Sequence, residues 1–179
     1  LDEAARKCGV EARVHLKLDT GMGRVGLRFD EVEQFLSAIV GLRNLRITGL
    51  MTHFAAADNL SQADFTRLQM ARFNKALELL SKAGIDPEFV DMANSPGAVV
   101  FPESRGNMVR IGGIMYGLGD DVLPRDVPGP ELKPVMSIVT KVAVVKRIKT
   151  GESVGYGRSF KAKDAITAAV LPLGYNDGY

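Results

Sequence analysis

Two basic residues lie in or shortly after the first strand-like segment of this sequence. Lys17 lies within the alternating run 13–19, and Arg24 follows a glycine-rich turn. Because Lys17 points away from the apolar side chains of that run, it would point into the interior of a barrel, where an uncompensated ammonium is costly. The alternative is that its amine reaches solvent at the rim. Arg24 could hold a carboxylate through two parallel hydrogen bonds.

Two further strand-like segments end in residues that suit proton transfer or an anion. His53 follows the second segment, where it could exchange a proton near neutral pH or simply be a structural residue. Ser95 follows the third segment and precedes Pro96, a pair that favours the start of a helix. A helix start with a hydroxyl offers free backbone N–H groups to a phosphate.

Arg110, Gly112 and Gly113 stand together at the end of a fourth segment. Paired glycines after a strand expose backbone N–H groups that also suit a phosphate. Arg110 stands just before them, where it is placed to reach a ligand. Two anion-binding loops with a nearby histidine and arginine indicate a phosphorylated planar cofactor.

Tyr175 stands between the apolar segment 171–173 and Asn176-Asp177-Gly178, a composition that predicts a tight turn. On turn chemistry alone, Tyr175 is an aromatic residue at the boundary of a strand. The alternative is that the turn presents the phenol of Tyr175 to a functional site.

The remaining pattern indicates the elements that position these residues. Strands are predicted at 13–19, 47–54, 88–92 and 108–111, and helices at 30–39, 61–83 and 96–101. Asp30 with Glu33 predicts a capping box on the first helix, and Gly84 is expected to end the second. Strand and helix alternate, which predicts a parallel sheet with crossover helices. No Gly-x-Gly-x-x-Gly follows a strand, so a dinucleotide fold is not indicated.

The length of the alternating region sets the domain organisation. Each βα unit takes roughly 30 residues, so about four units are present, whereas a closed eight-unit barrel takes about 250 residues. We therefore predict an α/β fold, the C-terminal half of a (β/α)8 barrel over 1–122, and a Pro-rich linker over 123–131. Strand-like runs at 136–146 and 165–173 predict the start of an all-β domain over 132–179.

Composition argues against several classes of function. A net charge of +2 with mixed signs gives no case for nucleic acid or an anionic membrane surface. No apolar run approaches the roughly 20 residues that span a bilayer. Two histidines and one cysteine do not favour a metal site. The single Cys8 excludes an internal disulfide and fits a reducing compartment, the cytoplasm.

Five motifs in order, KLDTGMGRVG, THFAAAD, ANSPGA, VRIGGIMYG and LPLGYNDG, resemble those of the bacterial alanine racemase family. Members of that family are pyridoxal phosphate enzymes with an eight-fold barrel and a C-terminal β domain, and they form homodimers with shared active sites. The resemblance covers nearly the whole chain. It implies racemisation of L- and D-alanine by two bases, which supplies D-alanine for peptidoglycan.

The resemblance also implies a role for each candidate residue. Lys17 would be carbamylated and paired with Arg24, which would also contact the substrate carboxylate. Tyr175 would be a catalytic base that one subunit contributes to the active site of the other. The cofactor-binding residues would be His53 against the ring, Arg110 at the pyridine nitrogen, and Ser95, Gly112 and Gly113 at the phosphate.

One family motif, resembling VVKANAYGHG, is absent from residues 1–179. In the family it carries the lysine that binds the cofactor covalently, so we expect the isolated chain to be inactive. Because the sequence begins at Leu1 within a helix-like stretch, we expect it to be part of a longer polypeptide.

Three alternatives to alanine racemisation stay open. They are a serine or broad-specificity racemase, a non-catalytic pyridoxal phosphate-binding barrel protein, and a barrel decarboxylase of related fold. The strand pattern after residue 132 argues against the non-catalytic protein, since such proteins lack a β domain. The segment 94–97 and the GYNDGY end fit a racemase better than a decarboxylase.

Overall fold

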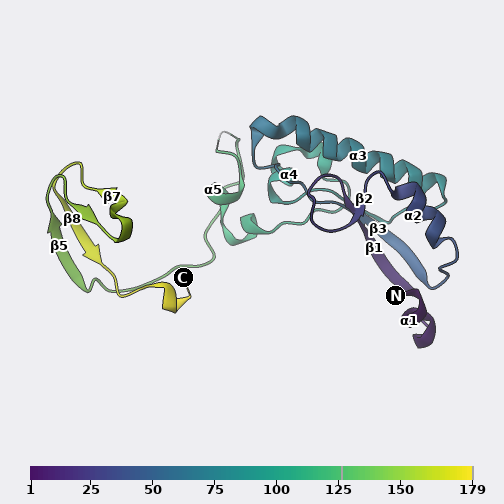
Figure 1. Cartoon of the computed structure of the whole chain (residues 1–179), viewed down its shortest axis with the longest axis horizontal. Helices are drawn as coiled ribbons and strands as arrows, with labels where there is room; N and C mark the ends of the chain where they lie inside the picture. Colours follow the sequence, from purple (N-terminus) through teal and green to yellow (C-terminus); the bar gives the residue numbers. More distant parts are fainter. Residues whose placement is uncertain (126, 179) are drawn as a thin grey trace. The chain divides into compact units, whose positions relative to one another are not determined.

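The computed structural model describes residues 1–125 and 127–178, which divide into two units, Leu1–Val135 and Met136–Tyr179. The first unit combines helices and parallel strands, and the second contains antiparallel strands (Figure 1). This combination confirms the predicted fold class, an α/β unit followed by a β unit.

The larger unit is organised around a parallel sheet. Its strands are β1 (Ala12–Asp19), β2 (Leu27–Arg28), β3 (Leu45–Met51) and β4 (Phe89–Asp91). They lie in the order β2-β1-β3-β4, and every neighbouring pair is parallel. The alternation of apolar and polar residues in 13–19 did predict β1, because one face of the sheet is covered and the other is not.

The helices of this unit are α1 (Asp2–Cys8), α2 (Val32–Ile39), α3 (Ala63–Lys82), α4 (Ser95–Val100) and α5 (Gly119–Val122). Helices α2 and α3 connect strands of this unit, and the others precede or follow the sheet in the chain. Short 3-10 helices cover Leu60–Gln62, Pro102–Ser104 and Gly113–Tyr116. As predicted, Gly84 lies at the end of α3, with a φ of 78° that favours glycine.

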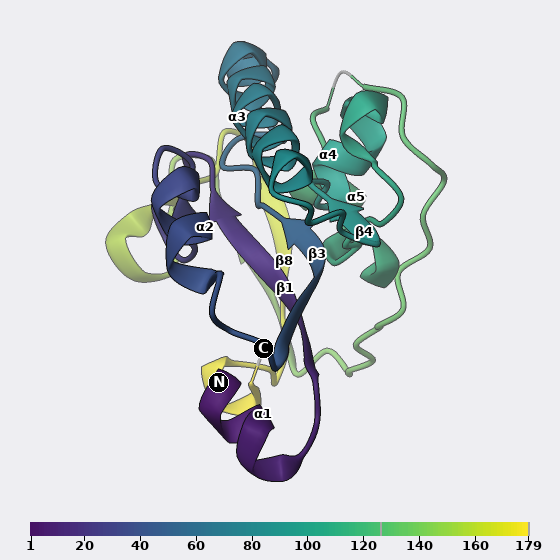
Figure 2. The same cartoon turned by 90° about the vertical axis from the view of Figure 1, so that its right-hand side faces the viewer.

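The hydrophobic core lies between the sheet and helices α2 and α3. Leu18 and Leu50 from the strands are fully buried against Phe73 and Leu80 of α3, and Val32 of α2 joins them. Figure 2 shows both helices running beside β1 and β3. Since the leucines of β1 point into this core, Lys17 lies on the opposite face of the strand.

The predicted strand at 108–111 is wrong, and the short strand β2 was not predicted. Residues near 108–111 do run beside β4, where the N–H groups of Asn107 and Arg110 donate to the carbonyls of Val90 and Ala93. However, the N–H of Val90 donates to the side-chain oxygen of Asn107 at 2.7 Å, so a side chain replaces the backbone partner that a ladder needs.

The predicted capping box on the first helix is also wrong. Helix α2 begins after Glu31, and no side chain caps it. The carboxylate of Asp30 instead accepts two hydrogen bonds from the guanidinium of Arg28, at 3.0 and 2.7 Å. A charged partner two residues away competes successfully with the helix N-terminus for this carboxylate.

The smaller unit holds two antiparallel pairs. Strand β5 (Val144–Ile148) pairs with β8 (Ile166–Val170), and β6 (Ser153–Val154) pairs with β7 (Phe160–Lys161). The first predicted strand therefore starts too early, at 136, and the last ends too late, at 173. The ladder stops where the N–H of Ala143 donates to the carbonyl of Val170. Among the residues that the structure describes, none pairs as a neighbouring strand with the apolar segments beyond this bond.

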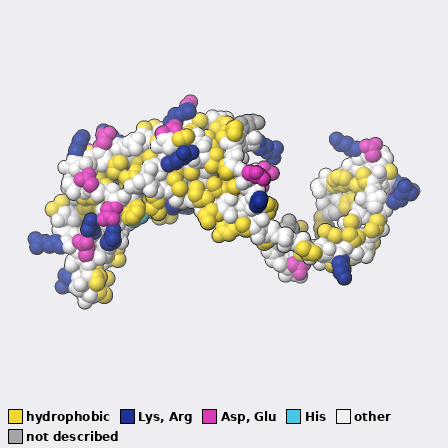
Figure 3. Space-filling view, turned by 180° about the vertical axis from the view of Figure 1, so that it is seen from behind, with side chains coloured by type: hydrophobic (Ala, Val, Ile, Leu, Met, Phe, Trp, Pro, Cys, Tyr) yellow, Lys and Arg dark blue, Asp and Glu magenta, His cyan; other side chains and the backbone are white. Residues whose placement is uncertain are grey.

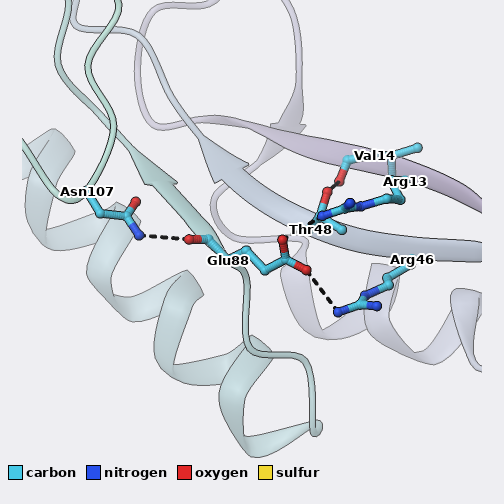
Figure 4. A network of polar contacts seen from close by, with 6 residues as sticks. All are labelled: Arg13, Val14, Arg46, Thr48, Glu88 and Asn107. Atoms are coloured by element: carbon cyan, nitrogen blue, oxygen red, sulfur yellow. Dashed lines mark hydrogen bonds and ion pairs between the residues drawn. The ribbon is translucent and has the colours of Figure 1, made fainter.

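A polar cluster joins the amino ends of three strands in the larger unit. The Glu88 carboxylate accepts from Arg13 of β1 at 2.5 Å and from Arg46 of β3 at 2.9 Å (Figure 4). Asn107 donates to the carbonyl of Glu88 at 2.7 Å. These ion pairs are exposed, so each contributes about 1 kcal/mol or less.

Hydrophobic side chains reach the surface of both units (Figure 3), among them Val40 and Met115 in the larger one. Within 1–125 and 127–178, no helix is both long and apolar enough to cross a bilayer.

Candidate functional site

The carboxyl ends of three neighbouring strands bring the candidate residues of the larger unit together. Lys17 of β1 pairs in register with Met51 of β3, and Met51 pairs with Asp91 of β4. His53 follows β3 by two residues. In a parallel barrel, functional side chains gather at this edge of the sheet.

Arg110 occupies the centre of this edge. Its Nη1 forms an ion pair with the carboxylate of Asp91. Its Nη2 donates to the carbonyl of Thr52 at 2.6 Å and lies 3.3 Å from Nδ1 of His53. The Arg110 side chain is 26% exposed, so it is held within the site with part of its surface open. These contacts are consistent with the prediction that Arg110 is placed to reach a ligand.

The contact with Arg110 fixes the proton on His53. A guanidinium has only donors, so Nδ1 must accept, and the neutral ring carries its proton on Nε2. Burial lowers the pKa of the His53 imidazole, and neighbouring cations, Arg110 first, lower it further. His53 is therefore neutral at neutral pH and presents an N–H on the side away from Arg110.

Lys17 lies in a crowded electrostatic environment. Burial lowers the pKa of its ammonium below the usual range, and the guanidinium groups of Arg110 and Arg24 lower it further. Asp19 and Asp91 oppose this shift without cancelling it. The expectation that Lys17 would need a partner or a chemical change therefore has a physical basis in the structure.

The loop after β1 is shaped by Asp19. Its carboxylate accepts from the N–H groups of Gly21 and Gly23, at 2.9 and 3.1 Å. Burial works to raise the pKa of the Asp19 carboxyl, but these hydrogen bonds outweigh it and hold the pKa below the usual value. Gly21 and Gly23 have φ values of 141° and 69°, which favour glycine. The loop leads directly to Arg24, which is exposed.

Ser95 and Gly112 are brought together, although they are 17 residues apart. The N–H of Gly112 donates to Oγ of Ser95 at 2.9 Å, and Gly113 begins the 3-10 helix that follows. The position of Ser95 before Pro96 suggested that Ser95 caps α4, but the structure shows that it does not. Asn94 is the N-cap, and its side-chain oxygen accepts from the N–H of Gly97 at 3.0 Å.

Tyr175 lies in the smaller unit, on the 3-10 turn Tyr175–Asp177, and its side chain is 92% exposed. The Asp177 carboxylate holds the turn by accepting from the N–H of Gly174 at 2.8 Å, and Gly178 closes it with a φ of 76°. The turn was predicted. The catalytic role of Tyr175 stays a prediction.

A buried polar chain beneath the site was missed by sequence analysis. Thr52 Oγ1 donates to the carbonyl of Leu18 at 2.9 Å, so it can only accept from Thr20 Oγ1 at 2.8 Å. Thr20 Oγ1 in turn accepts from Nε2 of Gln69 at 3.0 Å. Thr20, Thr52 and Gln69 are fully buried. They tie α3 to the two strands whose ends carry Lys17 and His53.

Replacing Gln69 with methionine should lower the free energy of unfolding by about 1–3 kcal/mol, because buried polar partners lose their hydrogen bonds. Its amide also accepts from the N–H of Ala55 at 3.0 Å and donates to the carbonyl of His53 at 3.2 Å. Urea unfolding measures the difference. The matched control is Gln62→Met at the exposed start of α3, with a change within about 0.5 kcal/mol. Equal effects for both variants would contradict the assignment.

These features define a class of protein. The larger unit is an α/β unit built on a parallel sheet, with basic, imidazole and hydroxyl side chains gathered at or after the carboxyl ends of its strands, as in the barrel enzymes.

Family models and curated proteins agree with this class. Residues 1–120 match the model described as alanine racemase, N-terminal domain, and residues 135–179 match alanine racemase, C-terminal domain. The chain therefore belongs to the alanine racemase family. The alanine racemases of Geobacter sp. strain M21 and Geobacter sulfurreducens are 40% and 39% identical over the whole chain. The chain spans about half the length of these relatives, 48% and 47%.

Solved structures of alanine racemases share the fold. The enzyme from D-cycloserine-producing Streptomyces lavendulae has a TM-score of 0.76 and 33% identity, over 99% of this chain and 47% of its own. The enzyme from Bacillus anthracis, solved with bound L-Ala-P, has a TM-score of 0.72 and 35% identity, over 99% of this chain and 46% of its own.

Proposed function

We propose that the protein carrying this chain is an alanine racemase that depends on pyridoxal phosphate and converts L- and D-alanine into one another. The D-alanine would serve peptidoglycan synthesis in the cytoplasm. Membership of the alanine racemase family supports this proposal. The single observation that carries it is the guanidinium of Arg110, held between Asp91, Thr52 and His53 at the strand ends.

The residues of this edge fit pyridoxal phosphate. A phosphate could bind at the start of α4, at Ser95, next to the backbone of Gly112. The space beside Gly112 is open, because a Cβ placed on this glycine would have only the Ser95 hydroxyl nearby. Arg110 has an N–H at Nε, for which none of the described residues provides an acceptor, and it would donate to the pyridine nitrogen. The flat, neutral ring of His53 would pack against the cofactor ring.

Arg110 determines how the cofactor works. Bound pyridoxal phosphate supplies an electron sink for the charge left when the Cα proton departs. Because an arginine side chain keeps its proton in proteins, Arg110 would hold the pyridine nitrogen by a hydrogen bond without giving up that proton. The sink is weaker as a result, which should limit side reactions such as transamination.

Racemisation requires proton transfer on both faces of the substrate. We assign one of the two bases to Tyr175, contributed by the second subunit of a homodimer. A nearby cation in the assembled site would favour the ionised form of the phenol. Arg24, on its loop after β1, would bind the substrate carboxylate through parallel hydrogen bonds.

The proposed activity can be tested with a panel of L-amino acids. The protein that carries this chain, supplied with pyridoxal phosphate, should convert L-alanine to D-alanine faster than it converts L-serine. Faster turnover of serine would favour the broader racemase. Cofactor binding without turnover of any member of the panel would favour a non-catalytic binding protein.

Lys17 is proposed to react with carbon dioxide. Only the neutral amine attacks carbon dioxide, and the lowered pKa of Lys17 raises the fraction of neutral amine at any pH below its usual range. The neutral amine and carbon dioxide would form a carbamate, and the two protons lost from the original ammonium would pass to solvent, so that an anion replaces a cation beside Arg110 and Arg24. With carbon-13-labelled bicarbonate, the wild-type protein should show a carbamate resonance.

Lys17→Arg should abolish this carbamate resonance. Lys7→Arg is the matched control, because Lys7 is exposed and paired with Glu3 at 2.8 Å, and the resonance should remain. A resonance that survives Lys17→Arg, or none in the wild-type protein, would rule out carbamylation at this position.

A further inference from the structure

Asp91 has a buried carboxylate that none of the motifs above includes. The residue ends β4 and is 1% exposed, and its ion pair is with Arg110. Among the residues that the structure describes, no hydrogen-bond donor contacts its Oδ1. A buried carboxylate is costly unless it is paired. Burial raises the pKa of the Asp91 carboxyl, and the guanidinium of Arg110 opposes this shift. Keeping a charge at this strand end therefore depends on Arg110.

The contacts of Arg110 show what that task could be. The carboxylate of Asp91 pairs with Nη1 of Arg110, while the carbonyl of Thr52 and Nδ1 of His53 contact Nη2. Because a guanidinium is planar, fixing both terminal nitrogens fixes the direction of the remaining N–H at Nε. The carbonyl of Thr52 alone leaves the plane free to turn, so Asp91 supplies the second anchor.

The charge of Asp91 matters as much as its position. Arg110, Lys17 in its unmodified form, and Arg24 place positive charge around His53, and each of them lowers the pKa of its imidazole. Asp91 is the carboxylate in direct contact with this group of charges. Without it, the positive charge of Arg110 would act on its neighbours uncompensated.

We propose that Asp91 is a positioning residue, whose carboxylate orients the guanidinium of Arg110 and compensates its charge beside His53 and Lys17. Its effect on cofactor binding rests on the proposed function, whereas its effect on His53 does not. The two consequences are therefore measured separately, first on the protein without cofactor and then with added pyridoxal phosphate.

The test is the titration of the His53 imidazole, followed by NMR in the protein that carries this chain and assigned with His53→Gln. Asp91→Asn keeps the shape and removes the charge, so the midpoint of His53 should move to lower pH. Glu88→Gln is the matched control, since Glu88 is also paired with arginines but at the amino ends of the strands (Figure 4). It should leave the midpoint unchanged.

Two further variants keep the proposal testable if Asp91→Asn does not fold. Arg110→Gln removes the guanidinium, and the midpoint of His53 should then move to higher pH. The double variant Asp91→Asn with Arg110→Gln removes both charges of the ion pair. No buried charge is then left unpaired, so the protein should fold. Its His53 midpoint should lie above that of Asp91→Asn alone.

Pyridoxal phosphate binding gives the second readout. Asp91→Asn should raise the dissociation constant about 10-fold, the size of effect seen when an outer partner of a ligand-holding group is removed. A His53 midpoint that is the same in Asp91→Asn as in the wild-type protein would overturn the proposal. A shifted midpoint in a protein that binds no cofactor would support the role of Asp91 and contradict the proposed function.

Discussion

Replacing Tyr175 with phenylalanine should lower kcat/KM for L-alanine by about 10²–10⁴-fold in the protein that carries this chain. This is the range expected when one positioned acid–base group is removed. Phenylalanine keeps the ring, so packing is retained and only the phenolic oxygen is lost. Because the two enantiomers have equal free energy, kcat/KM must fall by the same factor in both directions.

The control for this variant lies in the same unit. Tyr156→Phe removes another highly exposed phenol, on the 3-10 turn Tyr156–Arg158, and should change kcat/KM less than twofold. A Tyr175→Phe protein that keeps most of its racemase activity would show that another group supplies the second base.

The second large effect concerns stability. Replacing Phe73 with alanine should lower the free energy of unfolding by about 3–5 kcal/mol, the cost of emptying a fully buried aromatic position. Phe73 of α3 is 0% exposed and packs in the core beneath β1 and β3. Urea or thermal unfolding of the protein that carries this chain would measure the loss.

Leu68 of the same helix provides the matched control. Its side chain is 45% exposed, so Leu68→Ala should cost less than about 1 kcal/mol. A similar loss for Leu68→Ala and Phe73→Ala would mean that α3 presents a different face to the sheet.

Helix α3 also shows how far periodicity predicts packing. The pattern located the helix, but hydrophobic periodicity alone does not show that Thr66 and Gln69 are buried while Leu68 is 45% exposed. Hydrophobicity assigns polar residues to solvent, whereas these two are buried, and Gln69 contacts Thr20 and His53 next to the site. Gln69 is buried because its amide meets partners from the segments that follow β1 and β3, and such partners cannot be recognised from the sequence of a single helix.

Strand boundaries failed for a related reason. Residues 108–111 and 136–143 are apolar enough for strands, yet a strand exists only where a neighbour completes the ladder. Asn107 uses its side chain where the ladder needs backbone, and the ladder of β5 with β8 stops at Ala143. By contrast, β1 was predicted almost to the residue, since its alternation reflects one covered and one open face.

Several residues of the candidate site were predicted from the sequence, but the contacts between them were not. Lys17, His53 and Arg110 were identified from their positions near strand ends, and the structure does bring them together. Asp91 was overlooked because it falls inside a predicted strand, where a carboxylate has no signature until its partner is known. Its pairing with Arg110 joins residues 19 positions apart.

Racemisation of L-alanine in deuterated water tests the central proposal most directly. With pyridoxal phosphate added, the protein that carries this chain should form D-alanine that holds deuterium at Cα, since the base on one face removes a proton and Tyr175 exchanges with solvent on the other. Cofactor-dependent D-alanine that keeps its original Cα proton, or no cofactor-dependent D-alanine at all, would contradict the account.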